Sequence, residues 1–130
     1  MPIHTVLRQY KDQSSIALQQ TESVTGNTEI NADVAIPATT NNQQVHLAFT
    51  RANLQSVALY ADAAVTIYTN SPSGSSPTDT IPLVAGQNSI WTLATNLLAK
   101  CPFTADVTTI YITNAGGATS NVKIRALANQ

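Results

Sequence analysis

The chain has 130 residues, of which 43% are hydrophobic and only 10% are charged, and its formal net charge is -1. A chain of this length is expected to form one domain that buries roughly two thirds of its unfolded surface, so it needs neither a metal nor a disulfide to fold. The small net charge and the scattered lysines and arginines would not attract polyanions or acidic membranes, so we expect no binding to nucleic acid or to a membrane.

Residues 1–12 show no clean apolar period, which predicts either an N-terminal arm that adds an edge strand or reaches a neighbouring molecule, or a frayed terminus. Arg8 and Tyr10 lie in this arm and are candidate interface residues. The remaining residues, 13–130, are expected to form a single β-sandwich domain. The start of the chain lacks the apolar run of a signal peptide, and no stretch of about 20 apolar residues occurs, so we expect synthesis in the cytoplasm.

The first half of the sandwich is predicted from alternating apolar residues. A strand is expected at residues 29–36, and Pro37 ends it because proline cannot donate to a sheet ladder. A second one-sided strand is expected at residues 44–49. Residues 56–61 and 65–69 follow as a predicted hairpin, with their apolar side chains set against one another.

The second half of the chain is nearly continuous strand and turn. Two closely similar stretches, residues 65–70 and 109–114, each indicate a strand that ends at an asparagine and opens into a loop of small residues. Further strands are expected at residues 80–84 and 121–127. Residues 92–100 contain leucines at helix-like spacing and are expected to form one or two helical turns that plug one end of the sandwich.

About eight strands with turns at roughly ten-residue intervals predict an all-β fold, a two-sheet antiparallel β-sandwich of jelly-roll type. Its core is expected to contain the apolar residues that alternate along six segments. They are Ile30, Val34, Ile36, Leu47, Phe49, Leu59, Val65, Ile67, Ile110, Ile112, Val122 and Ile124. Trp91 and Phe103 lie in apolar company and are expected to join this core.

The sequence contains no recognisable catalytic arrangement. His4 and His46 have no metal-binding spacing, and the carboxylates are spread one per loop or strand. Asp79 and Asp106 are expected to stabilise turns, and the single cysteine, Cys101, is expected to be a buried, unreactive thiol. We therefore expect no enzyme activity, no cofactor and no metal site.

Tyr68 and Tyr111 fall opposite the apolar residues of their own strands, so both should point away from the core. Outward tyrosines suit a carbohydrate platform or a protein interface, because the ring is apolar and the hydroxyl can stay hydrogen-bonded. A surface of uncharged polar groups can also be covered by a partner without the desolvation of ions. We expect a homo-oligomer, a dimer or trimer, with these tyrosines at an interface.

Four runs of this sequence resemble the small head-decoration, or cementing, proteins of tailed bacteriophages. The runs are residues 65–71, 79–87 followed by 90–91, 106–116 and 122–127. The resemblance extends over residues 54–127 and implies a jelly-roll β-sandwich that binds the outer surface of an HK97-type capsid as an oligomer. Such a protein would stabilise the capsid by bridging neighbouring capsomers, with the major capsid protein as its partner and the virion surface as its location. Residues 93–101 depart from the short loop expected there.

A capsid offers many identical sites, so a small protein can hold on through several weak contacts at once. The alternative that the sequence leaves open is a carbohydrate-binding or host-attachment module of a phage tail or a cell surface. A hydrolase with dispersed carboxylates is a third reading, which would require a deep cleft with two facing acids.

Overall fold

The computed structural model describes residues 1–12, 15–93 and 100–130. Within these ranges the regular structure is β-strand, apart from one short 3-10 turn, η1 (Arg51–Asn53). The strands are β1 (Ile3–Asp12), β2 (Ser15–Thr25), β3 (Thr28–Ile36), β4 (Thr40–Val45), β5 (Leu54–Ala61), β6 (Val65–Thr69), β7 (Thr80–Leu83), β8 (Asn88–Thr92), β9 (Ile110–Asn114) and β10 (Ser120–Ala128). The helical turns predicted at residues 92–100 fall mainly on 94–99, outside the described residues. No helix in the described ranges is long and apolar enough to cross a membrane.

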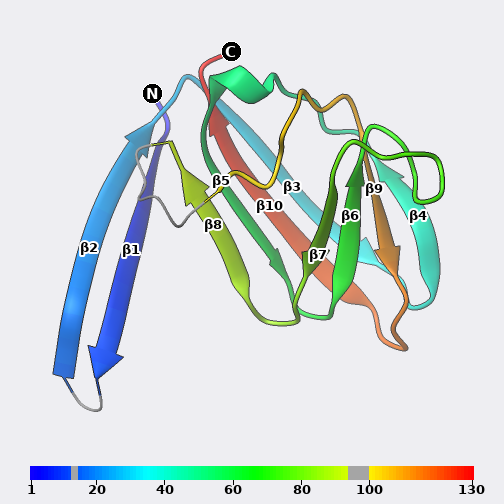
Figure 1. Cartoon of the computed structure of the whole chain (residues 1–130), viewed down its shortest axis with the longest axis horizontal. Helices are drawn as coiled ribbons and strands as arrows, with labels where there is room; N and C mark the ends of the chain where they lie inside the picture. Colours follow the sequence, from blue (N-terminus) through cyan, green and yellow to red (C-terminus); the bar gives the residue numbers. More distant parts are fainter. Residues whose placement is uncertain (13–14, 94–99) are drawn as a thin grey trace.

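Strands β3 to β10 form a sandwich of two antiparallel four-stranded sheets (Figure 1). The first sheet has the order β3-β10-β5-β8 and the second sheet has the order β4-β9-β6-β7. Every connection between consecutive strands from β3 to β10 crosses from one sheet to the other, except that between β6 and β7. This is the connectivity of a jelly roll, so the predicted all-β sandwich is confirmed.

The predicted hairpin between residues 56–61 and 65–69 was wrong. β5 pairs with β10 and β8, whereas β6 pairs with β9 and β7. Alternation identifies the apolar face of each strand but does not reveal whether the chain stays in one sheet at the next turn. The apolar side chains of these two strands therefore meet across the core, from opposite sheets.

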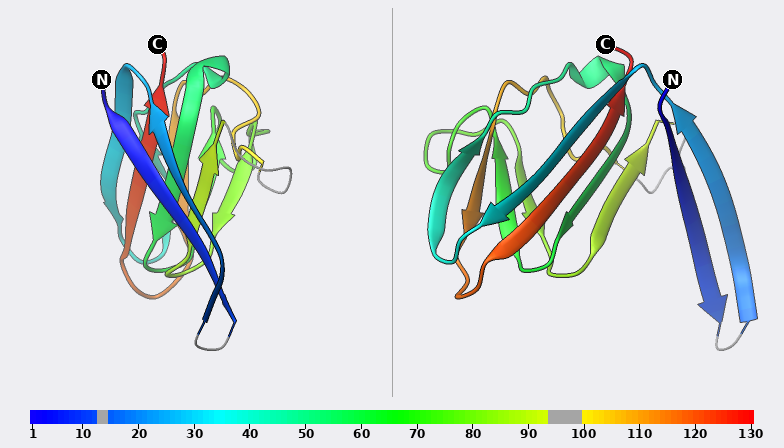
Figure 2. Two further views of the ribbon diagram at one scale, coloured as in Figure 1. Left: turned by 90° about the vertical axis from the view of Figure 1, so that its left-hand side faces the viewer. Right: turned by 180° about the vertical axis from the view of Figure 1, so that it is seen from behind.

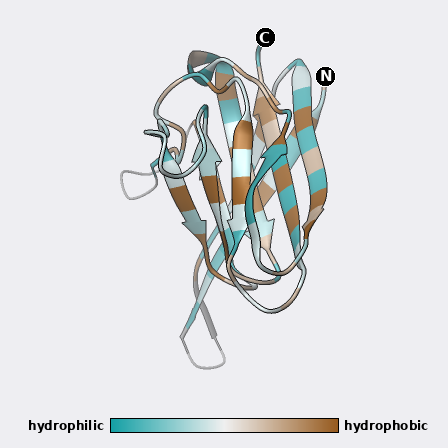
Figure 3. Ribbon diagram, turned by 90° about the vertical axis from the view of Figure 1, so that its right-hand side faces the viewer, coloured by the Kyte–Doolittle hydropathy of each residue, from teal (hydrophilic) through white to brown (hydrophobic). Residues whose placement is uncertain are grey.

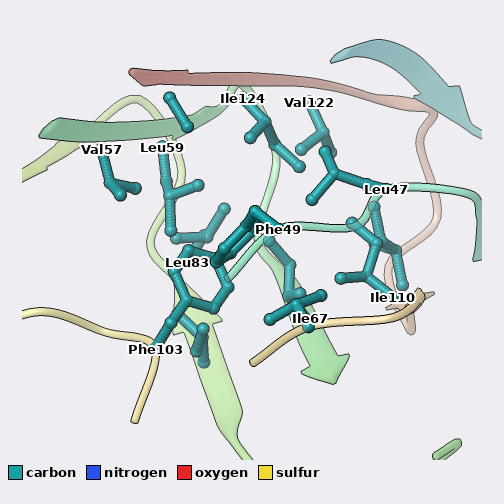
Figure 4. Close-up of a cluster of buried hydrophobic side chains, with 14 of the residues drawn as sticks. Leu47, Phe49, Val57, Leu59, Ile67, Leu83, Phe103, Ile110, Val122 and Ile124 are labelled. Carbon is teal, nitrogen blue, oxygen red and sulfur yellow. The ribbon is translucent and has the colours of Figure 1, made fainter. Parts of the chain in front are cut away.

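The hydrophobic core lies between the two sheets (Figure 4), and hydrophilic and hydrophobic residues alternate along the strands that enclose it (Figure 3). All the predicted core residues are buried except Ile30 and Val34, which are half-buried and pack against the core. Both lie on β3, an edge strand of its sheet, where cover from neighbouring strands is smaller. Trp91 and Phe103 are buried as predicted, and the Phe103 ring meets the Phe49 ring edge to face at a centroid distance of 5.0 Å.

β1 and β2 form a separate two-stranded antiparallel sheet, here called the hairpin. Its base touches the sandwich and its far end stands apart from it, as Figures 1 and 2 show from three sides. The sequence placed the boundary between arm and sandwich at residue 12, whereas the structure places it between β2 and β3. Residues 15–25 alternate in a way that suits a sandwich strand, but they pair with β1.

The first and last strands of the sandwich, β3 and β10, are neighbours in one sheet. Their register runs from Thr28 opposite Ala128 to Ile36 opposite Ser120. Beyond this ladder, the Gln130 backbone N–H donates to Asn27 Oδ1 at 3.0 Å. The start of the sandwich and the C-terminal end of the chain therefore lie together, beside the base of the hairpin (Figure 1).

Candidate interaction surfaces

The outward side chains of the second sheet form an uncharged surface, here called the tyrosine face. At the outward positions of its four strands, all of them fully described, no side chain is charged. The face consists of Gln44, Thr66, Tyr68, Thr80, Pro82, Tyr111 and Thr113. Tyr68 and Tyr111 lie directly opposite each other in the β6–β9 register, and both are half-buried.

Burial along the strands agrees with the predicted orientation of the two tyrosines. Val65 and Ile67, on either side of Thr66, are buried, as are Ile110 and Ile112 beside Tyr111. Because side chains alternate along a strand, the tyrosines point away from the core. The structure brings them together as one pair, which the sequence alone did not predict. Their place in an interface stays a prediction.

The loop between β6 and β7 is tied down beside the tyrosine face. The Ser73 backbone N–H donates to Asn42 Oδ1, and Asn42 Nδ2 donates to Ser73 Oγ, both at 3.0 Å. At the start of the loop, Asn70 has a φ of 68° and its Nδ2 donates to the Asp106 carbonyl at 2.9 Å. The loop therefore offers a fixed polar rim to any partner that covers the face.

The two aspartates predicted to stabilise the turns they occupy bond to segments that are distant in the sequence. Asp79 accepts hydrogen bonds from the Thr104 backbone N–H at 2.9 Å and from Thr104 Oγ1 at 2.7 Å. Asp106 accepts from the backbone N–H of Arg51 at 2.8 Å, at the start of η1. These carboxylates are engaged in holding loops.

The hairpin exposes large apolar side chains on both of its faces. Ile3 and Leu7 are 61% and 56% exposed on one face. Tyr10 and Leu18 are 64% and 69% exposed on the other face, where they lie directly opposite each other in register. The arm residue Tyr10, predicted to be at an interface, is thus at an open surface together with a leucine that sequence reasoning did not select.

Arg8, the other arm residue predicted to be at an interface, is half-buried, whereas Tyr10 is exposed. Its Nη1 donates to Glu22 at 3.1 Å, and the Glu22 carboxylate also accepts from Thr92 Oγ1 at 2.7 and 2.9 Å. The Glu22 side chain is only 11% exposed. Arg8 Nη2 is buried and has no hydrogen-bond partner among the described residues. Arg8 therefore helps to orient the carboxylate that fastens the hairpin to β8.

A trough runs along the outer face of the first sheet, beside the hairpin. It consists of two adjoining hollows of about 430 and 420 Å³ that share Ala58 and Arg125. Ala58 lies between Arg125 of β10 and Ile90 of β8 in the sheet register, so its small side chain leaves a depression between two long ones. Leu7 of the hairpin lines the same hollow as Ile90.

The first sheet differs from the second in its charge. Arg125 Nη2 donates to both Asp33 carboxylate oxygens, at 2.8 and 3.0 Å. His4 of the hairpin lies 3.2 Å from Glu29 of β3 through Nε2 and 3.3 Å from Ser56 Oγ through Nδ1. The charged side chains of the outer faces thus gather on this sheet, away from the tyrosine face.

Among the described residues, no group of three or more His, Cys, Asp or Glu side chains lies where it could hold a metal ion. Cys101 is half-buried, whereas the sequence predicted a buried thiol, and desolvation raises its pKa. A raised pKa keeps the thiol protonated and weakly nucleophilic at neutral pH. His46 is exposed, as expected for a histidine on a polar strand face.

No protein-family model matches the chain, and comparisons with curated proteins and with solved structures give no match either.

Sequence reasoning missed Leu18 and Ala58 as surface residues of interest. A signal for the hairpin was present, because residues 3–10 have apolar side chains on both faces, and such a strand needs cover on both sides. Nothing in the sequence marked Ala58, whose importance comes from its neighbours on β8 and β10.

Proposed function

We propose that the chain is a virion structural protein that binds the outer surface of an HK97-type capsid and stabilises it by bridging neighbouring capsomers. The observation that supports this function is the presence of two separate contact surfaces on one small sandwich. The tyrosine face belongs to the second sheet, and the hairpin stands at the other end of the long axis (Figure 1). A bridging protein must hold two bodies at once, so it needs surfaces of this kind in different directions.

The chemistry of both surfaces suits contact with protein. The tyrosine face combines aromatic rings with hydroxyl groups and has no ions to desolvate. The hairpin adds exposed Leu7, Tyr10 and Leu18. The proposed partners are the major capsid protein and further copies of this chain, in a dimer or trimer on the capsid surface. Each contact can be weak, because many bound copies act together on one particle.

The test is the release of packaged DNA on heating, from capsids that lack the protein and from the same capsids after its addition. Decorated particles should release DNA at a higher temperature, because a ligand that binds only the intact lattice shifts the equilibrium toward that lattice. The effect should persist in chelator and change little with salt. Equal release temperatures, or a protein present in a few copies at the tail, would show the proposal to be wrong.

The tyrosine face gives this test a matched pair of variants. The double variant Tyr68→Ser, Tyr111→Ser should lose capsid binding while the free protein still unfolds cooperatively. Asn31→Ser, an exposed change on the outer face of the first sheet, should bind as the unaltered chain does. Equal binding by both variants would exclude the tyrosine face as the capsid contact.

A second candidate function is a carbohydrate-binding or host-attachment module of a phage tail or a cell surface. The adjacent pair Tyr68 and Tyr111 favours it, because jelly rolls occur in lectins as well as in viral proteins and outward aromatic rings can receive sugars. A glycan array distinguishes the two functions. Binding to a defined glycan that is lost in Tyr68→Ser would support attachment.

A further inference from the structure

We propose that the far end of the hairpin, here residues 8–11 and 18–20, docks in the trough of a second copy of the chain, with Tyr10 and Leu18 placed over Ala58. In a closed dimer or trimer, each copy donates one hairpin and receives another. This contact would explain how copies of the chain associate with one another. It rests on the self-association in the proposed function and not on capsid binding, so it can be tested without capsids.

One face of the hairpin has different surroundings at its two ends. Alternation and register place His4, Val24, Tyr10 and Leu18 on the same face. At the base this face lies against the first sheet, where Val24 is buried and His4 lies 3.3 Å from Ser56 Oγ. At the far end, the same face exposes Tyr10 and Leu18 by 64% and 69%. An isolated two-stranded hairpin is marginally stable in water, so the far end needs a sheet to pack on.

The trough offers the same kind of surface that the base of the hairpin already covers. Both belong to the outer face of the first sheet, and Ser56, under the base, is followed two residues later by Ala58, on the floor of the trough. Ile90 is 39% exposed and forms an apolar wall. Arg125 is paired with Asp33, and Lys123, which also lines the trough, is exposed and can keep its ammonium group in water.

The area of the contact favours a second copy over an unrelated partner. Strands rise about 3.3 Å per residue and lie about 4.8 Å apart, so four residues on each of two strands cover only about 13 by 10 Å on one side of a contact. A stable interface buries about 800 Å² on each partner. In a two-fold dimer, a copy that gives a hairpin and receives one makes two such contacts with the same partner and doubles this area, whereas a partner seated on one hairpin has half of it.

The experiment mixes two separately purified full-length variants under mild oxidation, both with Cys101→Ser to remove the native thiol. One has Leu18→Cys and the other has Ala58→Cys, with a tag on one chain to distinguish them by mass. Each variant carries a single cysteine, so a disulfide between Cys at position 18 of one variant and Cys at position 58 of the other must join two separate molecules. We expect a mixed disulfide-linked dimer. The control is Gln19→Cys mixed with Ala58→Cys, because Gln19 is adjacent to Leu18 but on the opposite face of the hairpin. The mixture of Gln19→Cys with Ala58→Cys should give little or no mixed disulfide-linked dimer.

Light scattering of the unaltered chain and of a Tyr10→Ser, Leu18→Ser variant provides the second measurement. The unaltered chain should form an oligomer, and the variant should shift to monomer with an unchanged circular dichroism spectrum. An oligomer whose Leu18 and Ala58 variants do not cross-link, or cross-link no more than the Gln19 control, contradicts hairpin docking but leaves self-association intact. A monomer at every concentration contradicts both. Neither result bears on whether the protein binds a capsid.

Discussion

At the scale of single residues, two asparagines with the same sequence context have different roles. Asn70 and Asn114 each end a strand in the two similar stretches, and the sequence predicted a turn role for both. Asn70 adopts a positive φ. Asn114 is fully buried, its Nδ2 donates to the carbonyls of Ile36 at 3.0 Å and Ala118 at 2.8 Å, and it joins β9 to the ends of two other segments. The turn role of Asn70 was predictable, but the partners of Asn114 were not, because Ile36 lies on a segment that only the fold brings close.

Asn114→Ala should lower the free energy of unfolding by about 2–3 kcal/mol, because it leaves buried carbonyl groups without a donor. The measurement is chemical denaturation. Asn31→Ala, an exposed asparagine on β3, is the control and should change stability by less than about 0.5 kcal/mol. Equal losses would mean that the hydrogen bonds of Asn114 contribute little.

Asp62 gives a prediction of pH dependence. Hydrogen bonds from Asn121, through Nδ2 at 2.8 Å and the backbone N–H at 2.7 Å, lower the pKa of Asp62 below its ordinary value. As the pH falls, the unfolded chain therefore takes up this proton before the folded chain does. The stabilisation is fully present above the ordinary carboxyl pKa of about 4 and is lost as the pH falls through the folded value.

Asp62→Asn should accordingly lower the melting temperature most at neutral pH, and the difference from the unaltered chain should shrink in acid. Thermal melts of both proteins from neutral pH down to about pH 2 would measure this. A difference that stays constant across the range would contradict the role of the ionised carboxylate.

At the scale of elements, strand positions were predicted far better than strand partners. Alternation is a property of one segment, so it located β3, β6 and β9 with their inward faces. Pairing depends on segments far apart in the chain, which is why residues 15–25 were assigned to the sandwich and β5 and β6 to a hairpin. The same limit applies to the candidate surfaces. The outward direction of the tyrosines depends on alternation within one strand and was predicted, but the trough beside Ala58 depends on strand pairing and was not.

Gly26, between β2 and β3, is the residue that lets the hairpin lie close to β10. A Cβ added there would come within 2.8 Å of the Ala128 carbonyl oxygen and 2.8 Å of Leu127 Cγ. Gly26→Ala should cost about 1–3 kcal/mol and loosen the base of the hairpin, because backbone must move to make room. Hydrogen exchange should show faster exchange of the β1 and β2 amides.

Gly117→Ala is the matched control for Gly26→Ala, since nothing lies within 4 Å of the added Cβ. It should leave both stability and exchange unchanged. If the two variants behaved alike, the close approach at Gly26 would not be what holds the hairpin in place.

At the scale of the whole molecule, the sandwich and the hairpin are separable in their packing. No described residue of the hairpin belongs to the main hydrophobic core cluster, and Val24 at its base is its buried apolar contribution. The sandwich should therefore fold without the hairpin, while the contacts that join copies should disappear.

Deletion of residues 1–25 should give a protein that keeps its β circular dichroism spectrum and unfolds cooperatively but is monomeric by light scattering. The control is deletion of residues 1–2 alone, which leaves both strands of the hairpin in place. An oligomer of unchanged size after removal of the whole hairpin would show that copies associate through the sandwich.

The adjacency of β3 and β10 also sets the order in which the chain can fold during synthesis. Because Thr28 pairs with Ala128, the ladder between β3 and β10 cannot be complete until β10 has left the ribosome. Contacts between such distant residues make folding slow, on the order of milliseconds to seconds. The hairpin involves only local pairing and can form long before. On polysomes, where many nascent copies are close together, the exposed apolar hairpin is present early while its receiving trough, which includes Arg125 of β10, is completed last.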